Sequence, residues 1–507
     1  MAVTASREVE RKCEVGPVVA LPDLAGLPGV ETVAAAREEL LEATYVDTAD
    51  LRLRAAGITV RHRTGGADAG WHLKLPAGDD REELTVDGPG DQVPAALSAL
   101  VRAQVRGRDL VPVVRLTTRR AVRRLAGRAG VVEVADDRVS GHVLPDGAAQ
   151  GWREWEAELK AGDPALLDAV HDRLTRAGAE PSRSASKLAR ILPCPAAVDH
   201  VQRPTGGTSR KRRLSAADVL HAHLREQVAE LVARDPQVRR DLPEAVHKMR
   251  VATRRLRGAL STFRPLLDRS QTEPVGEELR WLAHVLGAPR DAEVMLDRLR
   301  DLVAAQPPEL VLGKVQARMD SFMTGRHTAA HDRLVTALDS DRYLSLLGAL
   351  DGLVEAPPCL PAAHGPAATT LAPLVRRTWR KLNRSMTAAL KADLGPDQDA
   401  LLHQVRKDAK RTRYAAEAVR PAFGGAAKRY AAAIEDLQET LGDFHDGVVT
   451  REVLRLLGTR GHLAGDNAFT VGRLHALEQV RAERAVSRWP KARRAVSRRQ
   501  LRRWFDR

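Results

Sequence analysis

Cysteine, aromatic residues and long apolar runs are all scarce in this chain of 507 residues. The cysteines, Cys13, Cys194 and Cys359, are far apart and odd in number, which argues against a disulfide framework or a cysteine zinc site. Aromatic residues make up 3% of the chain, whereas Ala, Leu and Arg abound, which favours packed helices. No run of about 18 apolar residues occurs, and Glu8 and Glu10 stand where a signal peptide needs an apolar core. We therefore expect a soluble, cytoplasmic protein without a membrane partner.

The charge is unevenly divided along the chain. Residues 1–195 contain 27 Lys and Arg against 29 Asp and Glu, whereas the remaining 312 residues contain 54 against 37. The basic second part suits a polyanion, whether nucleic acid, an acidic membrane surface or polyphosphate. The length predicts two or three domains.

Alternating runs between turn residues predict strands through most of residues 8–192. The runs 59–63 and 71–75 flank Gly65 and Gly66, which is typical of a hairpin. Further strands are predicted at 81–86, 115–125, 131–134 and 152–160, with one helix near 93–105.

Several of these strands have one charged face. Read with a period of two, the segment 8–12 places three charges on one side: Glu8, Glu10 and Lys12. The segment 152–160 does the same with Glu154, Glu156, Glu158 and Lys160. A single such face is typical of an exposed edge strand. Several together favour a closed antiparallel barrel with a polar lumen, where carboxylates hold a divalent metal and bases hold phosphate.

These residues resemble the CYTH family of triphosphate tunnel metalloenzymes, whose signature E-x-E-x-K stands here at residues 8–12. The resemblance covers residues 1–195 and continues in order through 45–48, 61–63, 74, 81–83, 133–137, 154–158 and 186–187. It implies an eight-stranded tunnel that binds a triphosphate compound with Mg²⁺ or Mn²⁺. Family members often hydrolyse inorganic triphosphate or thiamine triphosphate, and some cyclise ATP.

The resemblance also implies roles for individual residues. The catalytic residues would be Glu8, Glu10 and Lys12. The metal ligands would be Glu8, Glu10, Glu83, Asp137, Glu154, Glu156 and Glu158. The substrate-binding bases would be Arg61, Arg63, Lys74, Arg81, Arg120 and Lys187. Arg119 competes with Arg120 for one family position, and Asp136 competes with Asp137 for another.

Residues 196–208 are predicted as a linker, and residues 209–507 as helices with Ala, Leu and Arg at helical spacing. Two helices are predicted at 214–234 and 242–267, the first with Ser215 and Asp218 placed as a capping box. A break near 355–369 divides this part into halves, about 209–354 and 370–507. The motif at His247 recurs at His403 with an offset of 156, and a second motif recurs with an offset of 155, which indicates an internal duplication.

One face of a helix in each half carries bases alone. The first contains His247, Arg250, Arg254 and Arg257, and the second His403, Arg406, Lys410 and Arg413. A solvated face usually mixes both signs, so this pattern indicates an anion-binding surface. The second part resembles the CHAD family, the conserved-histidine alpha-helical domain, which implies two pseudo-twofold four-helix bundles and inorganic polyphosphate binding. The implied ligand residues are His247, Arg250, Arg254, Arg255, Arg257, His403, Arg406, Lys410, Arg411 and Arg413.

The expected fold class is thus α+β and multidomain, an antiparallel eight-stranded β tunnel barrel followed by an all-α domain. The expected function is metal-dependent hydrolysis of triphosphate, inorganic triphosphate first, coupled to binding of inorganic polyphosphate. Two alternatives stay open: a non-catalytic polyphosphate-binding scaffold and an adenylate cyclase. Nucleic acid is the least favoured partner, because no duplex-docking motif accompanies the bases.

Overall fold

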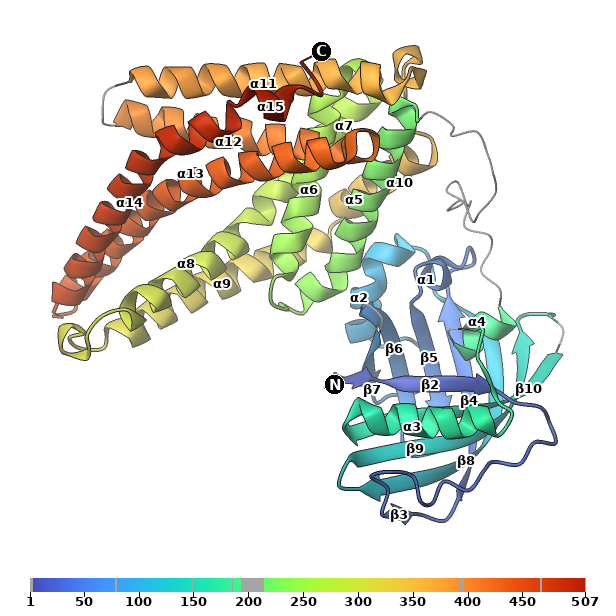
Figure 1. Ribbon diagram of the computed structural model, residues 1–507. Coiled ribbons are helices and arrows are strands. Elements are labelled where there is room, and N and C mark those ends of the chain that lie inside the picture. Colours follow the sequence, from blue (N-terminus) through green and yellow to red (C-terminus); the bar gives the residue numbers. More distant parts are fainter. Residues whose placement is uncertain are drawn as a thin grey trace. The chain divides into compact units, whose positions relative to one another are not determined.

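The structure, a computed structural model, describes residues 3–77, 80–147, 149–184, 186–192, 214–392, 396–465 and 467–506. The chain divides into two compact units, Met1–Gly207 and Thr208–Arg507, the first rich in strands and the second helical (Figure 1). This confirms the predicted α+β multidomain class. The predicted linker, residues 196–208, lies outside the described residues. None of the described helices combines the length and the apolar composition needed to cross a membrane.

The first unit is built on an antiparallel sheet with the strand order β1-β7-β6-β5-β4-β8-β9-β10-β2-β11. Its main strands are β1 (Thr4–Glu8), β2 (Glu10–Glu14), β4 (Arg37–Asp47), β5 (Thr59–Thr64), β6 (Gly70–Ala77), β7 (Asp80–Val86), β8 (Val111–Gly127), β9 (Gly130–Val143) and β10 (Ala149–Gly162). Two short strands, β3 (Thr32–Val33) and β11 (Glu180–Pro181), pair with β8 and β2.

The sheet closes on itself through its first strand. β1 and β2 form one run of chain interrupted only at Val9. β1 pairs with β7 and β2 pairs with β10, so the run joins the two ends of the sheet. Taken as one strand, it completes a tunnel of eight main strands within the described part of the chain.

Alternation along the strands separates a polar interior from an apolar exterior. Cys13 and Trp155, which face each other on β2 and β10, are fully buried in an outer apolar cluster. Lys12 and Glu156, one residue away, line the tunnel instead. Leucines and valines of α2 (Ala95–Val105) and α3 (Pro164–Arg176) complete the apolar clusters outside the sheet. The apolar burial that stabilises the closed sheet therefore lies outside it, and the lumen is left for charged groups.

The second unit consists of two successive sets of helices. The first set is α5 (Ala216–Arg239), α6 (Ala245–Thr262), α7 (Arg269–Val285), α8 (Gly287–Ala304), α9 (Val315–Leu338) and α10 (Asp341–Glu355). The second set is α11 (Ala367–Lys391), α12 (Pro396–Ala418), α13 (Arg420–Leu463), α14 (Phe469–Val496) and α15 (Arg499–Arg502). The predicted capping box at the start of α5 is confirmed, because Ser215 and Asp218 exchange side chain to backbone hydrogen bonds of 3.1 Å.

The two sets contact each other in several places, of which two bear on the site. The hairpin of α8 and α9 packs on that of α13 and α14 through an apolar cluster that includes Met295, Met319, Leu454 and Leu474. α6 contacts α12, the helix that carries the repeated basic motif. The duplication thus brings both predicted basic faces into one region of the unit.

Candidate active site and basic surface

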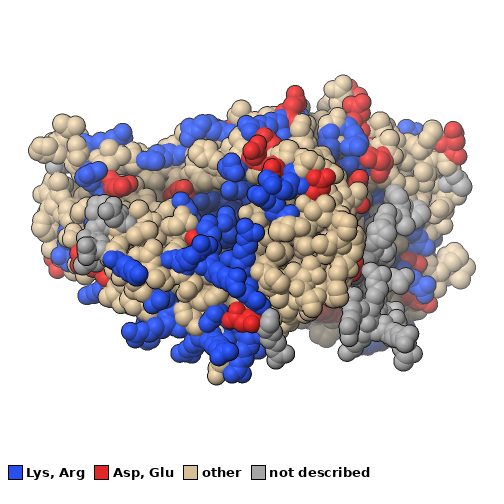
Figure 2. Space-filling view, turned by 90° about the horizontal axis from the view of Figure 1, so that it is seen from above, with Lys and Arg blue, Asp and Glu red and all other residues tan. Residues whose placement is uncertain are grey.

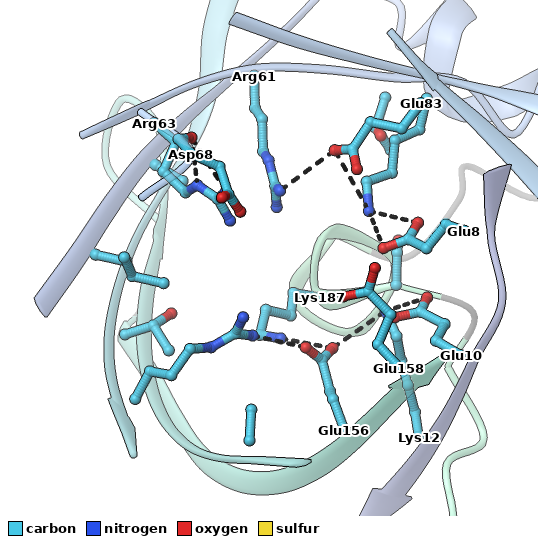
Figure 3. Close-up of a pocket in the computed structure, with 18 of the residues that line it drawn as sticks. Glu8, Glu10, Lys12, Arg61, Arg63, Asp68, Glu83, Glu156, Glu158 and Lys187 are labelled. Atoms are coloured by element: carbon cyan, nitrogen blue, oxygen red, sulfur yellow. Dashed lines mark hydrogen bonds and ion pairs between the residues drawn. The ribbon is translucent and has the colours of Figure 1, made fainter. Parts of the chain in front are cut away.

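Charged side chains from strands on all sides line the tunnel (Figure 3). The bases of the lining are Lys12, Arg61, Arg63, Lys74, Arg81, Arg120, Lys160 and Lys187. The acids are Glu8, Glu10, Asp68, Glu83, Glu133, Glu156 and Glu158. Within the described lining, eight bases thus accompany seven acids in one enclosed space. Three groups of charged contacts in and beside this space differ in how far their charges are balanced.

The first group is a carboxylate wall, formed by Glu8, Glu10 and Glu158 on β1, β2 and β10 (Figure 3). Glu10 and Glu158 are paired residues of neighbouring strands, and Glu8 lies two residues before Glu10 on the same face. Each carboxylate contacts a lysine, at N–O distances of 2.6, 2.9 and 2.6 Å for Lys74–Glu8, Lys12–Glu10 and Lys160–Glu158. The pKa of Glu158 is nevertheless raised, mainly by burial. Lys160 opposes this rise, whereas the carboxylate of Glu8 adds to it. Each of these lysines is shared with a second carboxylate, that of Glu83, Glu156 or Glu133, so the negative charge of the wall is only partly offset.

The second group surrounds Glu83 on β7. Its carboxylate lies 2.9 Å from His72 Nδ1 and 3.7 Å from both Lys74 Nζ and Arg61 Nη2. Burial raises the pKa of Glu83, but the hydrogen bond with His72 and the charges of Lys74 and Arg61 outweigh burial and hold the pKa below its usual range. Arg61 also donates to the hydroxyl of Tyr45 at 3.2 Å. Glu83 thus contacts His72, Lys74 and Arg61, and its predicted role as a metal ligand stays a prediction.

The third group surrounds Lys187, the first residue of α4 (Lys187–Ile191). Its Nζ lies 2.9 Å from Asp137, 2.7 Å from Glu154 and 2.7 Å from Glu156. Burial lowers the pKa of Lys187, but these three carboxylates outweigh it and hold the pKa well above its usual range. Arg120 adds a bidentate pair with Asp137, at 2.8 and 2.6 Å. Oxygens of the three acids lie within 4.8 Å of one another, a spacing that could hold a metal ion.

In the second unit, the basic faces of α6 and α12 lie together where these helices pack. Burial lowers the pKa of Lys410 to about 6, and the charges of Arg254, Arg406 and Arg250 contribute. Among the described residues, the ion pairs that these four bases form with acids are long. Arg250 lies 3.6 Å from Asp291, and Arg406 lies 3.9 Å from Asp446. We call Arg250, Arg254, Arg406 and Lys410 the basic seam. Its positive charge exceeds what the nearby acids offset.

Two other predicted bases of this unit are paired with acids, and the two predicted histidines have lowered pKa values. Arg255 and Arg413 both lie 2.9 Å from Glu417, and Arg413 also lies 2.6 Å from Glu435. The ring of His403 lies 4.7 Å from that of His445, and burial, His445 and the neighbouring bases lower its pKa to about 4. Burial and Arg290 likewise lower the pKa of His247. Both predicted histidines are therefore neutral at pH 7.

Two family models match the chain, the CYTH domain over residues 6–192 and the CHAD domain over residues 222–455. The protein Rv2226 of Mycobacterium tuberculosis is 38% identical over 500 residues, which cover 94% of each chain. The chain belongs to the family of CYTH–CHAD proteins. The structural match with PptA from Streptomyces chartreusis covers 55% of this chain and 100% of the PptA chain, at 27% sequence identity and a TM-score of 0.47. The match with the CHAD domain from Ricinus communis covers 60% of this chain and 97% of that domain, at 22% sequence identity and a TM-score of 0.40.

The CYTH domain offers two carboxylate groups to the divalent metal on which its family depends. Carboxylate oxygens are ligands that Mg²⁺ and Mn²⁺ prefer. The wall of Glu8, Glu10 and Glu158 faces the cavity, and its three lysines are shared with other carboxylates, so its partly offset charge fits a divalent ion. Asp137 and Glu154 have suitable spacing but lie outside the lining, and with Glu156 they already hold the ammonium of Lys187.

The strand register decides between the competing neighbours. Arg120 points into the tunnel, whereas Arg119 is exposed. Asp137 turns inward to Arg120, whereas Asp136 pairs with Arg153 at 2.6 Å on the other side of the sheet. Adjacent residues of a strand face opposite sides, so each choice follows from alternation.

The lining includes three charged residues that were not predicted as site residues: Asp68, Glu133 and Lys160. Lys160 follows the two-residue period of the predicted strand 152–160, which is a signal sufficient to find it. Asp68 lies in the turn between β5 and β6, where it pairs with Arg63. No periodic pattern extends into that turn, so this contact had no signal in the sequence.

Proposed function

We propose that the CYTH domain hydrolyses a triphosphate compound, inorganic triphosphate first, with Mg²⁺ or Mn²⁺ held by Glu8, Glu10 and Glu158. The observation that carries the proposal is the carboxylate wall, which shares one enclosed space with bases from β5 to β8 and α4. A divalent ion adds positive charge to a wall whose lysines are shared with other carboxylates. A triphosphate supplies negative charge to bases such as Arg61, whose ion pair with Glu83 is long, at 3.7 Å.

In this proposal, the position of each side chain in the tunnel determines its role. Arg61, Arg63, Lys74, Arg81 and Arg120 bind the phosphate oxygens, and Tyr45 and Glu83 fix the direction of Arg61. Lys12 lies between Glu10 at 2.9 Å and Glu156 at 3.2 Å, so its ammonium stays charged and holds a phosphate oxygen next to the wall. When bound, the metal would neutralise phosphate charge and activate water for attack on a terminal phosphorus.

The CHAD domain, in the same proposal, binds inorganic polyphosphate at the basic seam. The proposal is supported by the lowered pKa values of the seam. Burial and the charges of neighbouring bases lower the pKa of Arg250, Arg406 and Lys410. Figure 2 shows Lys and Arg gathered in a dense group on one face of the molecule, where Asp and Glu are fewer. A flexible chain of phosphates can follow such a surface without a docking motif.

A substrate panel tests the enzymatic proposal. We expect phosphate release from inorganic triphosphate that requires Mg²⁺ or Mn²⁺ and stops with EDTA, because the wall needs a divalent ion. The same assay with ATP and thiamine triphosphate ranks the substrates, and chromatography of the ATP products detects cyclic AMP. Polyphosphate binding is measured separately by calorimetry in EDTA. If polyphosphate binds but none of the three compounds is turned over, the scaffold alternative replaces the proposal.

The lowered pKa of Lys410 predicts that polyphosphate binding depends on pH. With a pKa of about 6 in the free protein, Lys410 is mostly neutral at pH 8 and gains its proton as the pH falls. A polyanion favours the charged form, so affinity should rise from pH 8 to pH 6, by at most about tenfold per pH unit for one proton. Lys410→Arg keeps its charge at both values, so it should bind more tightly at pH 8 and lose this rise. Calorimetry in buffers of different ionisation enthalpy measures the proton uptake, and an unaltered pH profile in this variant would contradict the role of Lys410.

A further inference from the structure

A groove opens beside the basic seam, between α6, η1 (Arg264–Leu266), α7 and α12. Its bases are Arg254, Arg257, Arg264, Arg280, Lys407, Lys410 and Arg411. Three of these, Arg264, Arg280 and Lys407, were not among the predicted polyphosphate-binding residues. The acids of the groove are Glu273 and Glu277. The groove thus extends the seam between α7 of the first set of helices and α12 of the second.

Most bases of this groove have no acid partner. Among the residues that the structure describes, only Arg264 has an ion pair there, at 3.8 Å from Glu273, whose carboxylate lies closer to Arg269 at 2.7 Å. Burial lowers the pKa of Arg257, and the charges of Arg280, Arg254 and Arg411 lower it further. The groove therefore carries surplus positive charge, which a bound anion would offset.

The pseudo-equivalent flank carries a different set of charges. By the repeat offsets of 155 and 156, the positions equivalent to Arg280 are Glu435 and Asp436. The position equivalent to Lys407 is Val251. Arg413, the counterpart of Arg257, is held by Glu417 and Glu435, and Arg255, the counterpart of Arg411, by Glu417. The motif was duplicated, but at these positions the bases of one flank have no acid partner among the described residues, whereas those of the other flank are replaced or held by acids.

From this asymmetry we infer that a long polyphosphate chain leaves the basic seam on one side only, through the groove of Arg257, Arg264, Arg280 and Lys407. The inference rests on the proposed polyphosphate binding and names the route of the chain. Short chains contact the seam alone, whereas longer chains add contacts in the groove. Chain-length preference therefore arises from this groove.

A linear polyphosphate suits this groove better than single-stranded nucleic acid. Proteins that bind single strands offer aromatic side chains on which bases stack. The aromatic residue of the described groove lining is Tyr414, and guanidinium groups lie over its ring, that of Arg254 at 5.9 Å and that of Arg413 at 5.4 Å. The ring is thus already occupied by cations, and what the groove offers is charge.

The test compares chains of about ten and about one hundred phosphates on the full-length protein in EDTA, by calorimetry over a range of salt. In Arg264→Gln/Arg280→Gln, affinity for the long chain should fall about tenfold and the salt dependence should become shallower by about two contacts, with short-chain binding unchanged. The matched control is Arg420→Gln/Arg429→Gln, which removes two exposed bases of the opposite flank and should change neither affinity. Circular dichroism confirms that both variants are folded.

The outcomes separate the groove from the proposed function. No binding of either chain by the wild type would remove the proposed function and the groove with it. An unchanged long-chain affinity in Arg264→Gln/Arg280→Gln, while Arg254→Gln weakens both chains, would leave the seam and overturn the groove. An equal loss in the control variant would also overturn it, because the effect would then be one of net charge. Equal competition by single-stranded RNA at matched charge would overturn polyphosphate as the preferred ligand.

Discussion

Replacing Glu10 by Gln should lower kcat for triphosphate hydrolysis by about 10³-fold, with no comparable loss of stability. The magnitude follows because charge stabilisation by a metal is worth several kcal/mol and each 1.36 kcal/mol is tenfold in rate. Glu10 is the central carboxylate of the wall, next to Glu8 on its own run and opposite Glu158 on β10. Glutamine keeps the volume but removes the charge. Steady-state kinetics over a range of Mn²⁺ concentrations should show a weaker dependence on metal together with the lower rate.

The control for this variant is Glu180→Gln, an exposed residue of β11, the strand beside β2. It removes the same charge outside the tunnel and should leave the rate unchanged. In Glu10→Gln, Lys12 keeps Glu156 as a partner at 3.2 Å, so the tunnel should stay folded. A wild-type rate in Glu10→Gln would exclude the wall as the metal site and would favour Asp137, Glu154 and Glu156 instead.

The strands and their charged faces were predictable because alternation is a local property. The hairpin at Gly65 and Gly66 is confirmed, with both glycines at positive φ between β5 and β6. The closure of the sheet is different, since it depends on one short run that pairs with β7 before Val9 and with β10 after it. That pairing joins residues far apart in the chain, and no local pattern contains it.

Which charge meets which was harder to predict than which residues carry charge. Lys187 was predicted to bind phosphate, but the structure surrounds it with Asp137, Glu154 and Glu156. Three separate elements have to come together for this contact. Arg413 is the opposite case, because Glu417 follows it at helical spacing and the ion pair could have been foreseen. Local pairs are visible in a sequence, whereas tertiary ones are not.

Replacing Lys187 by Met should destabilise the CYTH domain by about 3–5 kcal/mol, because removing one partner of a buried ion pair leaves uncompensated charge. Asp137 is fully buried, and the side chains of Lys187 and Glu154 are 10% and 5% exposed. Hydrogen exchange of the full-length protein, followed in β9 and β10, measures the loss of stability within this domain. The control is Lys160→Met, whose pair with Glu158 is 40% and 33% exposed and should contribute about 1 kcal/mol or less.

The Lys187→Met variant should also gain far more protection from Mn²⁺ than the wild type does. Without the ammonium, three carboxylates whose oxygens lie within 4.8 Å of one another are left to bind a divalent ion, and binding to the folded state alone stabilises it. An ion held at the wall, which includes Glu158 of β10, protects both proteins, so the deciding quantity is the additional protection in the variant. Equal protection in both proteins would mean that removing the lysine opens no new metal site, and it would contradict the idea that Lys187 occupies the place of a cation. Additional protection in the variant would mean that the lysine fills this cluster in the wild type, which leaves Glu8, Glu10 and Glu158 as the carboxylates that hold the divalent ion needed for hydrolysis.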